Sequence, residues 1–345
     1  MLTLSKIEAG PGGIAVVPRE PRDPGPGEIR LRIEAAGVCG TDMQIYNWAP
    51  RMARRMALPR VLGHEASGVV EAVGTGVTNV KAGDHVSLES HIFCGTCKQC
   101  RGGKPHICTS THYPGIDIDG VFAEHAVVPA QIAWVNPPEL PHEVAALLEP
   151  LGIAVHAATE GSGVSGQAVL VSGCGPIGLM TVAVAARFGA WPIIAADLNP
   201  KRLAAAEALG ATHLLNAGEV EVAAQARQIT RGEGVDVAIE YSGSPAGFQA
   251  CLAALTRGGE FRLVGAPANP LEVDFTRWLL DCPRIYNIHG RRIWQDWERM
   301  SALVLGGQLD LRPVVSHQLP LSEGARAFDL IRAGEALKPL LRPGA

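Results

Sequence analysis

The chain has 345 residues, more than one hydrophobic core usually serves, so two domains are expected. Hydrophobic residues make up 47% of the sequence and charged residues 19%, which excludes the weakly hydrophobic, highly charged composition of disordered chains. The net charge is -4 and no long run of one sign occurs, so composition points to neither a nucleic-acid partner nor a membrane surface.

Residues 1 to about 150 have the composition of a β-rich domain. This part is rich in Gly and Pro, and its short alternating apolar segments, such as 28–35 and 68–73, are typical of strands. The first ten residues contain Lys6 and Glu8 but lack the apolar region of a secretion signal, and no run of about 18 apolar residues appears later. The expected location is therefore the cytoplasm.

Three short segments in this part contain scattered candidate ligands. Cys39 lies in Gly-Val-Cys-Gly-Thr-Asp, His64 and Glu65 lie in Gly-His-Glu, and Glu149 lies in Leu-Glu-Pro. Taken singly, each has an ordinary structural explanation, because a lone Cys is usually a core residue, a His–Glu pair can form a local hydrogen bond, and a Glu before Pro can shape a linker. Their spacing alone does not join them into one site.

Four of the eight cysteines lie close together, in the motif Cys94-x2-Cys97-x2-Cys100-x7-Cys108. Four thiolates can close a tetrahedral zinc shell at about 2.3 Å each and leave no position open, which predicts a structural zinc in this glycine-rich loop. The first three cysteines also resemble an iron–sulfur motif, although the fourth spacing argues against a cluster. The colour of the protein distinguishes the two, because zinc thiolates are colourless.

A glycine motif follows a predicted buried strand at 168–172 and opens an Ala-rich helix. In Gly173-Cys-Gly-Pro-Ile-Gly178 the first Gly permits a tight turn, the second lets the backbone approach a pyrophosphate, and the third permits close packing. Asp197 ends the next strand, where a carboxylate binds the ribose 2′-hydroxyl of NAD and repels the 2′-phosphate of NADP. The alternative is an ordinary turn in which Asp197 caps the next helix. The residues predicted to bind NAD are Gly173, Gly175, Pro176, Ile177, Gly178, Asp197 and Arg202.

Residues 166–286 alternate compact apolar segments with Ala-rich helical ones, which is typical of βαβ units around a parallel sheet. The predicted strands are 168–171, 192–196, 235–239 and 260–264, and the predicted helices include 176–188, 200–209 and, after the alternation stops, 294–305. We expect a first domain at 1–151 and 287–345, with a metal-binding lobe at 91–110, and a doubly wound NAD-binding domain at 152–286.

Together these motifs resemble the zinc-containing medium-chain dehydrogenase/reductase superfamily over essentially the whole chain. Within it, several segments look like the threonine dehydrogenase branch, namely 39–48 (CGTDMQIYNW), 102–103 (GG), 172–178 (SGCGPIG), 241–244 (YSGS) and 290–297 (GRRIWQDW). The resemblance implies an α/β fold with a β-rich, GroES-like catalytic domain and a Rossmann domain. It also implies NAD as cofactor, two zinc ions per subunit and a homo-oligomer, usually a tetramer.

The resemblance further implies roles for individual residues. A catalytic zinc would be held by Cys39, His64 and Glu149, with Glu65 as an alternating ligand or close neighbour. Zinc would activate the substrate hydroxyl, and hydride would pass to the nicotinamide ring. By the same resemblance, Thr41 would begin a proton path and His91 would lie near the substrate. The structural zinc would be held by Cys94, Cys97, Cys100 and Cys108.

Two departures from the branch bear on the substrate. Gln44 stands where threonine enzymes usually carry a histidine, and an amide takes up no proton near neutral pH. Trp48 is followed by a basic stretch that includes Arg51, Arg54 and Arg55, which is either a solvated face or a site for an anionic group.

The leading prediction is NAD-linked oxidation of a small secondary alcohol, L-threonine, to 2-amino-3-ketobutyrate. The first alternative is a dehydrogenase for a polyol, sugar, aminocyclitol or anionic alcohol, because fold and cofactor do not determine the substrate. The second is a non-catalytic NAD-binding protein, which the intact residues Cys39, His64 and Glu149 disfavour.

Overall fold

The computed structural model describes residues 1–267 and 269–344, and the chain divides into two compact units. One unit comprises Met1–Glu149 with Leu311–Ala345, and the other comprises Pro150–Asp310. Residues 287–310 therefore belong to the second unit, whereas the sequence predicts them in the first domain. The reason is contact with the helix that starts the second unit, where His156 Nδ1 lies 2.9 Å from the Gly290 carbonyl oxygen.

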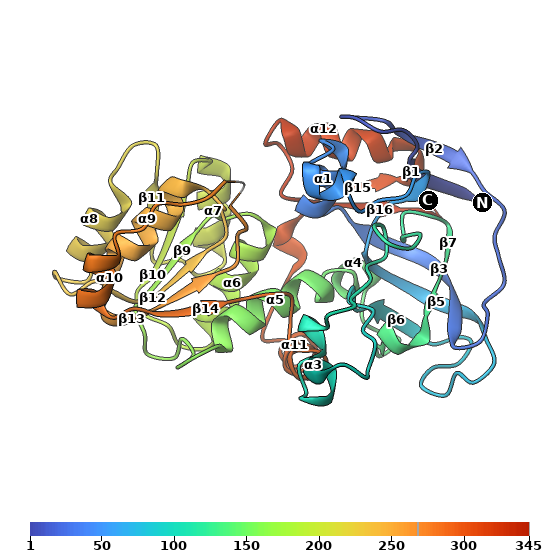
Figure 1. Cartoon of the computed structure of the whole chain (residues 1–345), viewed down its shortest axis with the longest axis horizontal. Coiled ribbons are helices and arrows are strands. Elements are labelled where there is room, and N and C mark those ends of the chain that lie inside the picture. Colours follow the sequence, from blue (N-terminus) through green and yellow to red (C-terminus); the bar gives the residue numbers. More distant parts are fainter. Residues whose placement is uncertain (268, 345) are drawn as a thin grey trace. The chain divides into compact units, whose positions relative to one another are not determined.

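The second unit is built around a wholly parallel sheet with the strand order β11-β10-β9-β12-β13-β14 (Figure 1). The strands are β9 (Val169–Ser172), β10 (Ile193–Asp197), β11 (His213–Asn216), β12 (Val235–Glu240), β13 (Leu255–Leu263) and β14 (Arg284–Asn287). Every residue of β9 is buried, as expected for a strand that is covered on both faces. Because the sheet grows outward on both sides of β9, the predicted doubly wound fold is confirmed.

Helices cover this parallel sheet. Side chains of α8 and α9 share a core with Leu170, Ile194 and Ala238, while α6 packs on β9 and β10. The helices are α5 (Leu148–Thr159), α6 (Pro176–Arg187), α7 (Pro200–Ala208), α8 (Val222–Ile229), α9 (Pro245–Ala254), α10 (Phe275–Asp281) and α11 (Gln295–Leu305). The glycine motif lies between β9 and α6, at the carboxyl edge of the sheet, where such folds bind ligands.

The first unit contains mainly antiparallel sheets. The larger sheet has the order β15-β16-β3-β5-β6-β8, with β7 also paired to β3, and the smaller has the order β2-β1-β4. Along β3, Ile29, Leu31 and Ile33 are at most 1% exposed and alternate with more exposed residues, as the alternating sequence predicts. The strands are β1 (Leu2–Lys6), β2 (Ile14–Pro18), β3 (Glu28–Gly37), β4 (Arg60–Val61), β5 (Glu65–Val73), β6 (His85–Leu88), β7 (His125–Pro129), β8 (Ala133–Val135), β15 (Val315–Pro320) and β16 (Lys338–Arg342).

Short helices join these strands. They are α1 (Gly40–Tyr46), α2 (Pro50–Ala53), α3 (Lys98–Arg101), η1 (Pro105–Ile107), η2 (Ala130–Ile132), α4 (His142–Ala145), η3 (Arg312–Val314), η4 (Leu321–Glu323) and α12 (Gly324–Arg332). None of the described helices has both the length and the apolar character needed to span a bilayer.

The register of three strands brings distant segments of the first unit together. β3 pairs antiparallel with β5, and Gly37 at the end of β3 lies opposite Glu65 at the start of β5. On its other side β3 pairs with β16, where Leu340 lies opposite the same Gly37. The segments around residues 39, 64 and 338 therefore meet at one end of the sheet.

Candidate functional site

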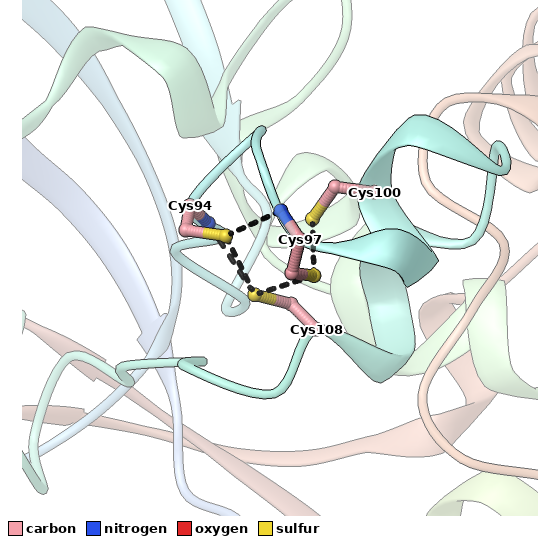
Figure 2. Close-up of side chains that lie close together, drawn as sticks. All are labelled: Cys94, Cys97, Cys100 and Cys108. Atoms are coloured by element: carbon pink, nitrogen blue, oxygen red, sulfur yellow. Dashed lines mark hydrogen bonds between the residues drawn. The ribbon is translucent and has the colours of Figure 1, made fainter.

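The metal-binding lobe predicted at 91–110 brings four sulfur atoms together. Those of Cys94, Cys97, Cys100 and Cys108 all lie within 4.8 Å of one another (Figure 2). Backbone hydrogen bonds between Ile92 and His112, of 2.9 and 3.0 Å, close the base of the lobe. Helix α3 and the 3-10 helix η1 then turn the chain so that all four side chains point to one centre.

The spacing of the sulfur atoms fits a tetrahedral zinc. The Sγ atoms of Cys97 and Cys100 are 3.5 Å apart, and Cys108 Sγ lies 3.9 Å from that of Cys97 and 3.5 Å from that of Cys94. Zinc–sulfur bonds of about 2.3 Å place the corners of a tetrahedron about 3.8 Å apart. Backbone N–H groups of Cys100 and Thr109 also lower the pKa of the Cys97 thiol to about 5, which favours the thiolate that binds metal.

A second set, the buried ligand group, consists of Cys39, His64 and Glu65, whose ligand atoms lie within 4.8 Å of one another. Cys39 is the residue before α1, while His64 and Glu65 stand at the start of β5. His64 is 7% exposed and Glu65 is 1% exposed. The pairing of β3 with β5 is what joins these residues, which lie 25 and 26 positions apart in the chain.

Two further buried charges surround the buried ligand group. Asp42, on α1, accepts a hydrogen bond of 2.9 Å from the Cys39 backbone N–H. The ammonium of Lys338, on β16, forms an ion pair with Oε2 of Glu65 and donates to the Val38 carbonyl oxygen at 3.1 Å. The other carboxylate oxygen of Glu65, Oε1, is buried and has no hydrogen-bond partner among the described residues.

The pKa directions show that negative charge accumulates in this group. Burial is the largest single influence on His64 and disfavours its imidazolium, but the charge and hydrogen bond of Cys39 together with the charges of Asp42 and Glu149 outweigh it, so the pKa of His64 rises to about 10. Burial raises the pKa of the Glu65 carboxyl, while Lys338 opposes the rise. A thiolate, an imidazole and an orphaned carboxylate oxygen form a donor set that suits zinc, and a divalent cation would offset this negative charge.

Glu149 stands in the first turn of α5 and is 4% exposed. It is not one of the residues whose ligand atoms share the 4.8 Å grouping. Its charge nevertheless acts on His64, Glu65 and Lys338. The structure thus joins Cys39, His64 and Glu65 directly and leaves Glu149 close by, so the role of Glu149 as a ligand stays a prediction.

The glycine motif of the second unit has the expected backbone geometry. Gly173 has φ +92°, and a Cβ there would lie 2.7 Å from the Ser242 backbone nitrogen. A Cβ on Gly178 would collide with the Gly173 carbonyl oxygen, so close packing requires glycine. A Cβ on Gly175 would meet no atom within 4 Å, so the space beside it is open. Pro176 and Ile177 are the first two residues of α6, and the N–H groups of its first turn lie directly after Gly175.

Asp197 ends β10 beside this turn. Its Oδ2 accepts a hydrogen bond of 2.7 Å from the Cys174 backbone N–H, and its Oδ1 accepts one of 2.8 Å from the Asn199 N–H. Arg202 Nη1, on α7, lies 3.7 Å from Oδ2. The carboxylate is therefore held against the glycine turn, and the N-cap of α7 is Asn199, which accepts from Lys201 N–H at 2.9 Å.

The remaining predicted residues of the first unit lie near α1 and after β6. Thr41 is half-buried on α1, and Gln44 is exposed on the same helix. In the basic stretch, Arg51 and Arg54 are exposed, whereas Arg55 donates two hydrogen bonds of 2.7 Å to the Asp117 carboxylate. Arg55 is therefore bound within the protein. Arg51 and Arg54 are the arginines of this stretch that an anionic group could reach.

His91 is 4% exposed, and its Nδ1 lies 2.7 Å from Oε1 of Glu89. The sequence prediction omits Glu89, as it omits Asp42 and Lys338. Glu89 could have been found from its place two residues before the candidate His91. Asp42 could have been found from its place three residues after Cys39, as in a capping box at the start of a helix. Lys338 has no such signal, because only the pairing of β16 with β3 brings it to the site.

Comparisons with known proteins agree with this architecture. The family model for the alcohol dehydrogenase GroES-like domain matches residues 25–139, and that for the zinc-binding dehydrogenase matches residues 176–306. The L-threonine 3-dehydrogenase of Bacillus velezensis is 43% identical over 317 residues, which cover 92% of this chain and 91% of the relative.

Solved structures agree as well. The alcohol dehydrogenase TADH from Thermus sp. ATN1 has a TM-score of 0.91 and 32% identity, with 99% of both chains covered. Galactitol-1-phosphate dehydrogenase from Escherichia coli has a TM-score of 0.90 and 27% identity, covering 99% of this chain and 100% of that chain.

Proposed function

The chain belongs to the zinc-dependent medium-chain dehydrogenase family, and from that premise we propose that it oxidises L-threonine to 2-amino-3-ketobutyrate with NAD. The observation that carries the proposal is identity of 43% to an L-threonine 3-dehydrogenase over 92% of the chain. The buried ligand group supports it, because a dehydrogenase of this family needs a cation next to the substrate hydroxyl.

We infer two zinc ions per subunit. Cys39, His64 and Glu149 would hold the catalytic zinc, with Glu65 alternating as a ligand, and the four sulfurs of the lobe would hold a structural zinc. The grouping of Cys39, His64 and Glu65 and that of the four sulfurs support two sites, while Glu149 is included on the resemblance alone. Held by the buried ligand group, zinc would supply Lewis acidity toward the substrate hydroxyl, and NAD would supply the hydride acceptor.

The protein's own residues orient the substrate and carry its proton. Thr41 would relay the hydroxyl proton, as the resemblance implies, accepting it while its own hydroxyl proton passes on, and its half-buried place on α1 keeps it near Cys39. Gln44 cannot receive that proton, so proton release passes from Thr41 toward solvent without a histidine. His91 would bind the substrate, because its ring is buried and held by a carboxylate.

NAD is the proposed cofactor, bound by the turn from Gly173 to Gly178. Support comes from Asp197, whose carboxylate stands beside the turn and would repel a 2′-phosphate. Arg202, whose Nη1 lies 3.7 Å from Oδ2 of Asp197, is a feature that would favour a phosphate. The ratio of turnover with NAD to that with NADP tests the assignment, and a clear preference for NADP would contradict the role of Asp197.

We also propose a cytoplasmic homo-oligomer, by resemblance a tetramer. Support for association comes from α10, on which Phe275, Leu279 and Leu280 are 75%, 76% and 66% exposed, and from β14, which is an edge strand of the parallel sheet. A cytoplasmic location is supported by cysteine usage, because four of the eight cysteines cluster with the spacing of metal ligands rather than of a disulfide framework.

A substrate panel with the zinc-loaded enzyme tests the function. L-threonine, a polyol, a polyol phosphate and a simple secondary alcohol are compared by NADH formation. The expected result is the highest kcat/KM with L-threonine. The polyol phosphate represents the chemistry of the galactitol-1-phosphate relative and of the exposed Arg51 and Arg54. Turnover of that compound without turnover of threonine would overturn the proposal, and no turnover of any alcohol would favour a non-catalytic protein.

A further inference from the structure

The carboxylate that holds the His91 ring belongs to Glu89. Glu89 follows β6 and is 0% exposed. Its Oε1 accepts a hydrogen bond of 2.9 Å from the His91 backbone N–H and lies 2.7 Å from Nδ1 of the same residue. A carboxylate that is removed from water must be stabilised by hydrogen-bond donors. Here the backbone N–H and Nδ1 of His91 both contact the same oxygen of Glu89.

The register of β5 with β6 places Glu89 and His91 at the same end of the sheet as the buried ligand group. β6 pairs antiparallel with β5, and Ser87 lies opposite Ser67. Two residues further in this register, Glu89 comes level with Glu65. His91 therefore leaves the sheet at the end where Glu65 and its partner ligands gather.

The His91 ring has a second contact, with the ring of Tyr113. The Tyr113 ring meets it nearly edge-on, with centroids 4.9 Å apart and an angle of 64°. Tyr113 is held in turn by Arg55, whose guanidinium lies 5.0 Å from the ring centroid, and by Asp117, which accepts from the Tyr113 N–H at 2.7 Å. Because Arg55 also binds Asp117, the ring has little freedom to rotate.

We propose that Glu89 is a positioning residue that fixes the Nδ1–H tautomer of His91, so that Nε2 accepts a hydrogen bond from the ammonium or hydroxyl group of an amino-alcohol substrate. A carboxylate offers only acceptors, so the proton of a neutral imidazole bound to it sits on Nδ1. The lone pair is then on Nε2. This inference rests on the proposed function, because it gives His91 a substrate to bind.

The chain contains a matched control pair. His125 Nδ1 lies 2.9 Å from Oε2 of Glu71, so the chemistry is the same. The side chains of this second pair are 31% and 27% exposed, however, and they lie on the strands β7 and β5 rather than in the buried segment after β6. Glu71→Gln should therefore leave substrate binding unchanged.

The test is a double-mutant cycle of Glu89→Gln and His91→Gln. Two quantities are measured in zinc-loaded protein: KM for L-threonine, and its dissociation constant by calorimetry in the presence of NADH. In Glu89→Gln the amide can donate to Nδ1 and permit the opposite tautomer. Both constants should rise about tenfold, the effect of one lost hydrogen bond to a charged group, while KM for NAD and zinc content stay unchanged. In the His91→Gln background the same substitution should add nothing.

The outcomes separate this inference from the proposed function. An equal rise in both backgrounds, or no rise in either constant, would overturn the positioning role of Glu89. If His91→Gln itself leaves threonine binding unchanged, then the proposed substrate contact of His91 is wrong. Should Glu89→Gln fail to fold, Glu89→Asp keeps the charge but falls one methylene short of Nδ1, and the same rise in KM is expected.

Discussion

The lobe and the buried ligand group both bring metal ligands together, but the lobe takes them from one short segment and the buried ligand group takes them from distant segments. The lobe takes all four ligands from residues 94–108, and its side chains are partly exposed. The buried ligand group joins the ends of β3 and β5, and it is flanked by Asp42 and Lys338, which are charged and buried. A local loop can therefore be organised by its metal alone, whereas the buried group exists only once the sheet is in register.

This difference predicts that ligand loss in the two places has different consequences. In the buried ligand group, the sheet holds the side chains in place without a metal. Loss of a ligand there should therefore lower activity rather than stability. The lobe is a short loop that contains several glycines and depends on its metal, so loss of a ligand there should lower stability.

The largest expected effect comes from Cys39→Ser. Hydroxyl is a poor zinc ligand compared with thiolate, and kcat should fall about 10³-fold or more. Zinc content should drop by one ion per subunit while NAD binding and Tm stay near those of the unmodified protein. Metal analysis and NADH formation check this prediction. Turnover within a fewfold of the original would show that the buried group does not hold the catalytic cation.

Cys100→Ser should have the opposite profile. Loss of one sulfur opens the tetrahedron, the lobe loses its zinc, and Tm should fall by roughly 10 °C. The decrease in kcat per folded subunit should be less than about tenfold. Cys282→Ser, at an exposed cysteine outside both groups, is the matched control and should change neither quantity. A large loss of activity with unchanged Tm would mean that the lobe is not structural.

The same difference explains what the sequence can predict. The lobe and the glycine turn were predictable because their residues are neighbours in the chain and each spacing has a physical reason. Cys39 and His64 could be joined only by resemblance, because their meeting depends on the register of Gly37 with Glu65. Glu149 was added to them by resemblance alone. Lys338 lay beyond any prediction, since it enters the site from a strand near the C-terminus.

The place of residues 287–310 was also not predictable from periodicity. The alternation of strands and helices ends near residue 286, but the segment that follows stays with the second unit. It is held there by long-range contacts, such as the hydrogen bond of 3.1 Å from Arg299 to the Thr159 hydroxyl. No local pattern in the sequence signals such a contact.

Lys338→Met tests whether the buried charges belong to the metal site. Removal of the ammonium leaves the Glu65 carboxylate buried without its partner, which should lower the free energy of unfolding of metal-free protein by about 3 kcal/mol. Zinc supplies another positive charge near Glu65, so the loss should be smaller in loaded protein. Denaturant unfolding with and without zinc measures both values.

The double variant Lys338→Met with Glu65→Gln is the control for that prediction. With both charges gone, the metal-free protein should recover part of its stability, because an uncompensated buried charge no longer exists. Equal losses in metal-free and zinc-loaded protein would show that Lys338 has only a structural role.

The smallest expected effects come from one glycine in each region. Gly103, in the lobe, has φ +73° and open space around it, so Gly103→Ala costs only the strain of the left-handed conformation, about 1 kcal/mol. Gly37 lies against Glu65 and Lys338, and an added Cβ would collide with the carboxylate. Gly37→Ala should therefore lower kcat/KM about tenfold by displacing Glu65. If Gly103→Ala reduces activity and Gly37→Ala reduces only Tm, the roles assigned to the two regions are reversed.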